Sequence, residues 1–159
     1  MRRTEASAVP YFGLITDKGV SMEEKVKRTE RGWCGHFIGG ADCMYHRNTL
    51  LEYGEQKVVV STIGHYLPWN KRQEYLKHGK MDFEMVGRDR YFETMAFLAD
   101  DSQYHDADVT KEIGFNSNWE LDKLDMEMEA DAMHDTVCDE IAEDLVNGTL
   151  CINDYENLC

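Results

Sequence analysis

The chain has 159 residues, 42% of them hydrophobic, which is enough for a single domain with its own core. Its net charge of −14 argues against direct binding to nucleic acid, and no apolar run approaches the roughly 20 residues that span a bilayer. Five cysteines at irregular spacings are unlike a secreted disulfide framework, and no apolar segment follows Arg2 and Arg3. We therefore expect a cytoplasmic protein.

The first 31 residues have the pattern of an irregular arm followed by a short helix. Ser21 and Glu24 have the spacing of a capping box, in which the two side chains bond backbone N–H groups at the start of a helix. The predicted helix reaches about Glu30. Its basic residues could bind an anion, although a solvated helix face is the simpler interpretation.

A β-hairpin is the clearest prediction in the first half of the chain. From Trp33 onwards, glycines among aromatic and β-branched residues indicate strands. Residues 57–63 form a β-branched run, and residues 42–52 are its expected partner across the Gly54-Glu55 turn.

The middle of the chain leaves more than one structure open. Residues 71–80, after a loop at Pro68, fit either a short helix or a lid-like excursion. Residues 81–98 are compatible with strand or helix because a short apolar run does not determine the period, and we favour strand. A further strand is predicted over residues 108–115.

The strongest local signal is a long, acidic C-terminal helix. Ser117 and Glu120 form a second capping box, and Gly148 is a helix stop that can adopt the left-handed conformation. A stripe of apolar residues recurs every four positions: Met133, Val137, Ile141 and Leu145, flanked by Ala130 and Cys138. A second row, the carboxylate ladder, has the same period: Glu127, Asp131, Asp135, Asp139 and Glu143. The two rows are offset by about 200° of helix rotation, so we expect the ladder opposite the core face.

Together these elements predict an α+β fold, an antiparallel sheet of four to six strands with the acidic C-terminal helix packed on one face. We divide the predicted single domain, residues 1–159, into four parts: an N-terminal arm and short helix (1–31), a mainly β region (32–116), the acidic helix (117–148) and a tail (149–159).

Charge is strongly segregated along the chain. Residues 100–159 carry 18 acidic and two basic side chains, whereas residues 1–99 carry 13 acidic and 15 basic ones. The ladder alone contains four like-charged i,i+4 pairs, which together cost an isolated helix about 1–2 kcal/mol. One interpretation is a surface that imitates the phosphates of a nucleic acid and occupies a basic groove on another protein. The other is a solubility face without a partner.

Two groups of residues could hold a metal. Cys34, His36, Cys43 and His46 are possible zinc ligands, but their spacing matches no established zinc finger, and Cys43 and His46 would point to opposite faces of a strand. We do not favour a zinc site; a buried cysteine, one hydrogen-bonded histidine and one exposed histidine explain the pattern. No cofactor is predicted.

The second group is residues 104–108, with His105, Asp106 and Asp108, together with His134-Asp135 on the helix. Histidine and aspartate occur together in metal-dependent hydrolases, although a turn rich in aspartate explains them as well. A nucleophile elbow, a phosphate loop and a dinucleotide fingerprint are all absent from the sequence.

Several stretches resemble uncharacterised small proteins of phages and mobile elements: Gly32-Trp33-Cys34-Gly35-His36-Phe37-Ile38, residues 46–51, residues 58–62, residues 91–97 and Asp106-Ala107-Asp108-Val109. The resemblance extends over most of residues 32–147 and implies an accessory gene, a class in which inhibitors of host defence are common. It implies no catalytic residues.

We therefore expect a non-enzymatic inhibitor of anti-CRISPR or anti-restriction type in the host cytoplasm. Its partner would be a basic, nucleic-acid-binding host protein such as a nuclease or effector complex, bound through the carboxylate ladder. The alternatives are a metal-dependent hydrolase acting on nucleotides or phosphoesters, and a zinc-stabilised structural or interaction domain. The sequence does not determine the oligomeric state.

Overall fold

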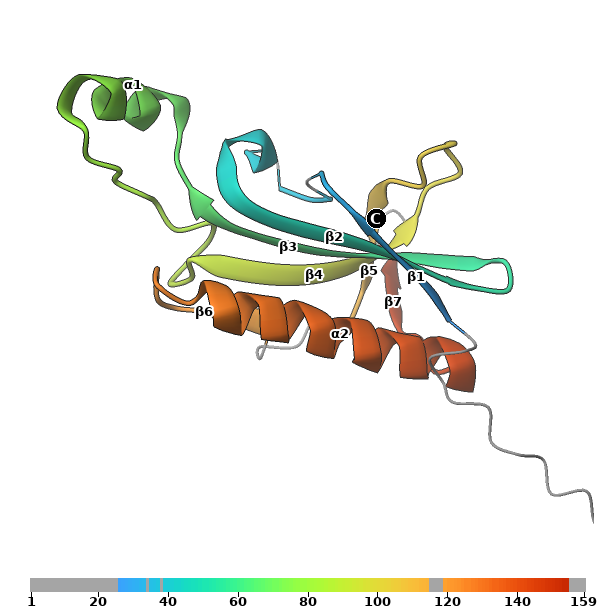
Figure 1. The fold of residues 1–159 in the computed structure, drawn as a ribbon. Helices are drawn as coiled ribbons and strands as arrows, with labels where there is room; N and C mark the ends of the chain where they lie inside the picture. Colours follow the sequence, from blue (N-terminus) through green and yellow to red (C-terminus); the bar gives the residue numbers. More distant parts are fainter. Residues whose placement is uncertain (1–25, 34, 38, 115–118, 155–159) are drawn as a thin grey trace, which may run out of the picture.

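The computed structural model describes residues 26–33, 35–37, 39–114 and 119–154 (Figure 1). Within these ranges, seven antiparallel strands form one sheet in the order β1-β2-β3-β4-β5-β7, with β6 paired to β4. The strands are β1 (Lys27–Arg31), β2 (Cys43–Tyr53), β3 (Gln56–Tyr66), β4 (Phe92–Ala99), β5 (Ala107–Ile113), β6 (Glu120–Leu121) and β7 (Ile152–Asp154). The helices are α1 (Trp69–His78), α2 (Glu127–Asn147) and a 3-10 turn, Gly40–Asp42. The predicted α+β class is confirmed, and the sheet exceeds the expected four to six strands because it includes β1, where helix was expected, and the very short β6 and β7.

The β2–β3 hairpin forms the centre of the sheet, as the sequence predicted. Its turn is closed by Gly54, whose φ of 59° is a left-handed conformation that glycine adopts without steric cost. Tyr53 pairs with Gln56 at the turn, and the register continues without interruption through Asn48 opposite Ser61. Seven consecutive residues of β3, from Val58 to Gly64, are buried, so this strand is covered on both faces.

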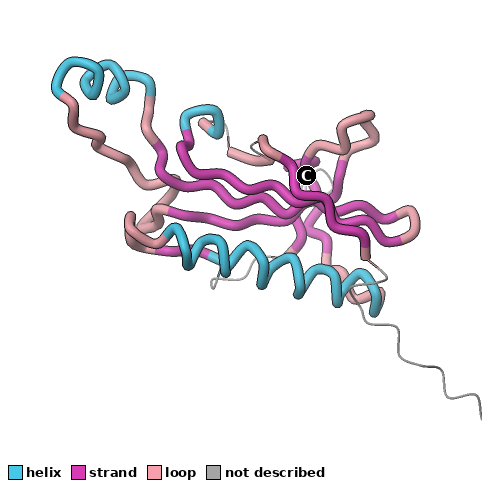
Figure 2. Tube along the Cα trace, in the orientation of Figure 1, coloured by secondary structure: helices cyan, strands magenta, loops and turns pink. Residues whose placement is uncertain are grey.

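Helix α2 lies across one face of the sheet, and α1 projects away from the sheet beyond the end of β3 (Figures 1 and 2). The main core forms between α2 and the sheet. Its members include Leu51, Val58, Val60, Ala96, Ile113, Trp119, Val137, Cys138, Ile141 and Leu145. Neither helix in the described part of the chain combines the length and apolar character of a membrane span.

Two stretches predicted as helix are strand where the structure describes them. Lys27–Arg31 is strand β1, paired with β2 from Lys27 opposite Glu52 to Arg31 opposite Asn48, where the first capping box predicted helix up to about Glu30. Ser21 and Glu24 lie outside the described residues. A capping box is a local signal, and pairing with an available sheet edge satisfies the backbone of the following residues instead.

The acidic helix begins at Glu127, ten residues after the predicted start at 117. Ser117 lies outside the described residues, and Glu120 belongs to β6, where it pairs with Glu93 of β4. Trp119 is buried in the main core, so tertiary packing draws this segment to the sheet. The predicted stop is confirmed, because Gly148 caps α2 with φ 68°. The strand expected within residues 81–98 is restricted to β4.

Candidate interaction surface

The apolar stripe positions α2 on the sheet. All four stripe residues are buried, as are the flanking Ala130 and Cys138. Burial raises the pKa of the Cys138 thiol to about 12, so it stays protonated and acts as a packing group. The expected core face of α2 is therefore confirmed. Because this face is turned to the sheet, it determines where the carboxylates of α2 lie around the helix axis.

The carboxylate ladder does not lie straight opposite the core. Four residues turn an α-helix by 400°, so each step of an i,i+4 row moves about 40° around the axis. The row therefore winds from the edge of the sheet at Glu127 to the outer face at Glu143. All five side chains are exposed, but four of them also contact side chains from the strands. These contacts are His65 Nδ1 to Glu127 (3.1 Å), Tyr45 Oη to Asp131 (2.6 Å), Arg47 to Asp131 (3.6 Å) and to Asp135 (2.9 Å), and Arg28 to Asp139 (2.6 Å).

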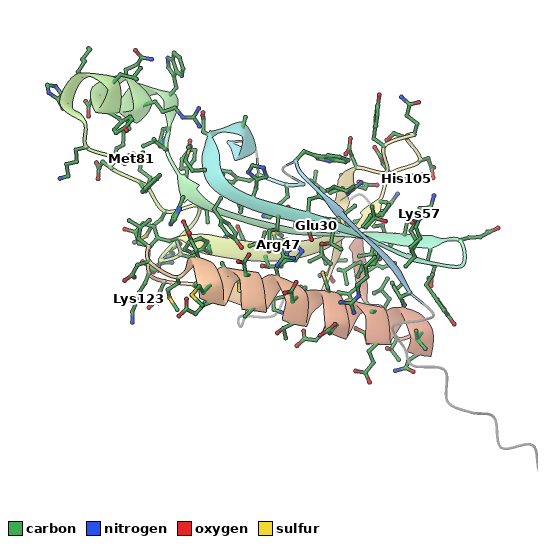
Figure 3. All side chains as sticks on the ribbon, viewed as in Figure 1. Glu30, Arg47, Lys57, Met81, His105 and Lys123 are labelled. Atoms are coloured by element: carbon green, nitrogen blue, oxygen red, sulfur yellow. The ribbon has the colours of Figure 1, made fainter. Side chains whose placement is uncertain are left out.

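Arg47 joins the first half of the ladder to the sheet (Figure 3). It lies on β2, and its guanidinium also binds Glu30 of β1 at 3.1 Å. Burial by itself would lower the pKa of Arg47, but hydrogen bonds to Glu30 and Asp135 raise it above its ordinary value. Burial by itself would raise the pKa of Glu30, but hydrogen bonds from Arg47 and Thr49 hold it below its ordinary value. One arginine thus offsets the mutual repulsion of three carboxylates.

The outer face of α2 keeps an excess of negative charge. The helix carries eight carboxylates and neither lysine nor arginine, and Arg28 and Arg47 compensate two of them, leaving six. Glu129 and Glu143 are exposed and have no ion pair with any described residue. Glu140 is also exposed and accepts a hydrogen bond from Trp119 Nε1 at 3.1 Å. These three glutamates, which we call the outer row, are the carboxylates most open to a partner.

A histidine is buried beneath the ladder. His134 Nε2 lies 2.8 Å from Thr49 Oγ1, and His134 Nδ1 lies 2.7 Å from Thr62 Oγ1. Thr49 donates its hydroxyl hydrogen to Glu30, so Nε2 must carry the ring proton and Nδ1 must accept from Thr62. Burial lowers the pKa of His134 to about 4. His134 is therefore a neutral part of the helix–sheet interface.

The opposite face of the sheet contains a buried polar layer centred on Arg31. Its Nε donates to Asn48 Oδ1 at 2.8 Å, and its Nη1 donates to the carbonyls of Tyr104 and His105 at 2.8 and 2.9 Å. The ring of Trp33 stacks on the guanidinium at 4.7 Å. Arg31 therefore anchors the loop between β4 and β5 to the first strand.

The four possible zinc ligands do not come together in the described structure. His36 is buried with its ring against Phe97, whereas His46 is exposed and bonds the carbonyl of Gly32 at 3.0 Å. Cys43 is buried in a separate small cluster with Ile63, and Cys34 lies outside the described residues. Among the residues that the structure describes, no three His, Cys, Asp or Glu side chains gather closely enough to hold a metal ion.

The segment 104–108 is likewise separated from His134. His105 Nε2 accepts from Lys57 Nζ at 2.7 Å, with His105 in a left-handed conformation at φ 50°. Asp106 accepts from Trp33, and Asp108 accepts from Thr110. These contacts explain the residues as parts of a well-bonded loop and of the start of β5, whereas His134 is buried between α2 and the sheet, next to Thr49 and Thr62.

The sequence analysis did not identify the sheet residues that contact α2. Tyr45, Arg47, Thr49 and Leu51 occupy alternate positions of β2, and each contacts α2 or the core beneath it. Their period of two was visible in the predicted strand, but which face meets the helix depends on the tertiary arrangement.

Comparison with protein-family models found no matching family. Comparisons with curated proteins and with solved structures also found no match.

Proposed function

We propose that the protein is a non-enzymatic inhibitor that binds a basic, nucleic-acid-binding host protein, such as a defence nuclease or effector complex, through the acidic surface of α2. The observation that carries the proposal is the excess of six carboxylates on α2 after its contacts with the sheet arginines are counted. An uncompensated field of this size raises the rate of encounter with a cationic partner.

The charge density of α2 can be compared with that of DNA. The 21 residues of α2 extend over about 30 Å, so six uncompensated charges amount to one per roughly 5 Å. Double-stranded DNA carries one charge per about 1.7 Å. The linear charge density of α2 is therefore about one third of that of DNA. A surface of this charge density is better suited to compete for part of a basic groove than to replace a whole duplex.

The contacts of the ladder change which residues we assign to the partner. Of the five ladder residues, Glu143 alone is without a polar contact to a described side chain, whereas Asp131 and Asp135 are held by Arg47. We therefore place the partner contact on the outer row, Glu129, Glu140 and Glu143, with Asp139 beside it. The metal-dependent hydrolase and zinc-domain alternatives gain no support from the positions of their candidate ligands.

The test uses a triple variant, E129Q/E140Q/E143Q, and a matched control, E55Q/E74Q/D101N. Both sets remove three exposed carboxylates, and the control residues lie in the β2–β3 turn, α1 and the loop after β4. Each chain is expressed in bacteria with a CRISPR or restriction nuclease, and the survival of incoming phage DNA is measured. Purified nuclease then gives affinity and its dependence on salt.

We expect the wild type and the control variant to protect phage DNA and to bind the nuclease with an affinity that falls steeply with salt. Exposed charges contribute up to about 1 kcal/mol each, so the outer-row variant should bind about 10- to 100-fold more weakly. Equal protection by both triple variants would contradict the assignment of the surface. An absence of protection by the wild type against every nuclease class tested would contradict the proposed function.

A further inference from the structure

Several large apolar side chains are exposed on the segment formed by residues 68–85, which we call the α1 arm. Helix α1 has no buried residue, and Figures 1 and 2 show it standing clear of the sheet. Trp69 is 67% exposed and Leu76 is 75% exposed. A groove of about 250 Å³ runs along the arm, lined mainly by Met44, Leu67, Trp69, Leu76 and Met81. Exposed apolar side chains gathered along one groove make the arm a candidate contact surface.

The α1 arm is also locally basic. Lys71 is held by Asp82 and Glu84, but Lys77 and Lys80 are exposed and form no ion pair with any residue that the structure describes. These two lysines flank the end of the helix next to Leu76 and Met81. A partner that covers the end of the groove beside these lysines therefore gains from combining an apolar contact with negative charge.

The start of α2 has this combination. Met128 is 83% exposed and Leu124 is 36% exposed. Both line a hollow of about 420 Å³, together with Asp125, Glu127 and Glu129. We call this surface the α2 start; it is an apolar pair surrounded by carboxylates, the chemical complement of the arm.

We propose that two copies of the chain pair reciprocally, with the α1 arm of each copy docked on the α2 start of the other. Within one copy the two surfaces lie on opposite sides of the sheet (Figure 1), so they meet between copies. Both lie at the same end of the molecule, where Figure 3 labels Met81 on the arm and Lys123 before α2. Two copies related by a two-fold axis therefore exchange both contacts at once and form a closed dimer.

In this dimer, Met128 and Leu124 of one copy enter the groove beside Trp69 and Leu76 of the other. Lys77 and Lys80 then face Asp125 and Glu129 across the contact. The pairing reduces the exposed apolar area of both surfaces and places opposite charges at their rim, which gives the contact its orientation. The contact shares Glu129 with the outer row, whereas Glu140 and Glu143 lie farther along α2, so dimerisation is measured separately from nuclease binding.

The experiment is a charge exchange on the full chain. The arm variant is K77E/K80E, and the helix variant is D125K/E129K. A control for the helix variant, E55K/E143K, makes the same charge change of +4 away from both surfaces. Analytical ultracentrifugation over a concentration series gives the dimer dissociation constant of each protein. An equimolar mixture of the arm and helix variants is measured in the same way, and circular dichroism checks that each variant is folded.

We expect the wild type and the control to dimerise. Each exchange variant alone should have a dimer dissociation constant at least tenfold higher than that of the wild type. The mixture should form a heterodimer, because one contact then pairs reversed charges and the other is unchanged. A wild type that is monomeric throughout, exchange variants that dimerise like the wild type, or a mixture that stays monomeric would each overturn the proposal. If a charge variant fails to fold, L76S and M128S test the same contact, and unchanged dimerisation of both would overturn it.

Discussion

Acidification should loosen the attachment of α2 to the sheet, because His134 is buried there in its neutral form. The pKa of His134 is lowered to about 4, first by burial and then by Arg47, while Glu30, Asp135 and Asp131 oppose the change. The ring nitrogen that would take up a proton, Nδ1, already accepts a hydrogen bond from Thr62. Protonation therefore places a charge in the interface and reverses that bond.

The size of the effect follows from the two pKa values. In the unfolded chain the histidine has an ordinary pKa of about 6.5, so the unfolded state binds the proton first as pH falls. Stability is complete above pH 6.5 and is lost as pH falls toward 4, since the folded pKa is the lower one. The loss amounts to about 3 kcal/mol over the whole interval and about 2 kcal/mol between pH 7 and pH 5.

The assay is urea unfolding of the wild type and His134→Gln at several pH values from 7 to 4.5. Glutamine can donate to Thr49 and accept from Thr62 without titrating, and the other histidines and the carboxylates titrate in both proteins. We expect the wild type to lose about 2 kcal/mol more than the variant between pH 7 and pH 5. Parallel curves, or a His134 pKa near 6.5 measured by NMR on the folded protein, would refute the reasoning.

Three further predictions concern the fold. Val137→Asp should unfold α2, since a charge enters the main core at a cost of several kcal/mol, and unchanged melting by circular dichroism would show that the core face is assigned wrongly. Gly64→Ala should destabilise the sheet by about 1–3 kcal/mol, because its Cβ would overlap the ring of Phe92; equal denaturation midpoints would contradict this. Arg47→Met should cost about 1–2 kcal/mol at low salt and less at high salt, since Glu30 and the ladder lose their shared cation; a salt-independent cost would show that packing dominates.

The local spacing of residue types was sufficient to predict the central hairpin and the buried face of α2. The β-branched run at Val58 and the Gly54 turn predicted the central hairpin, because strand pairing and turn geometry are determined by neighbouring residues. The four-residue spacing of Val137 and Ile141 predicted the buried face of α2 for the same reason. The α+β class follows from these elements.

Helix starts and charge partners depended on the tertiary structure. The helix expected to reach Glu30 is replaced by strand Lys27–Arg31, and Glu120 of the second capping box pairs with β4. Nothing in the sequence near Asp135 shows that Arg47, 88 positions away, lies 2.9 Å from it. The sequence determined that α2 is acidic, whereas the tertiary structure decided which of its carboxylates are compensated, because ion pairs form between residues that only folding brings together.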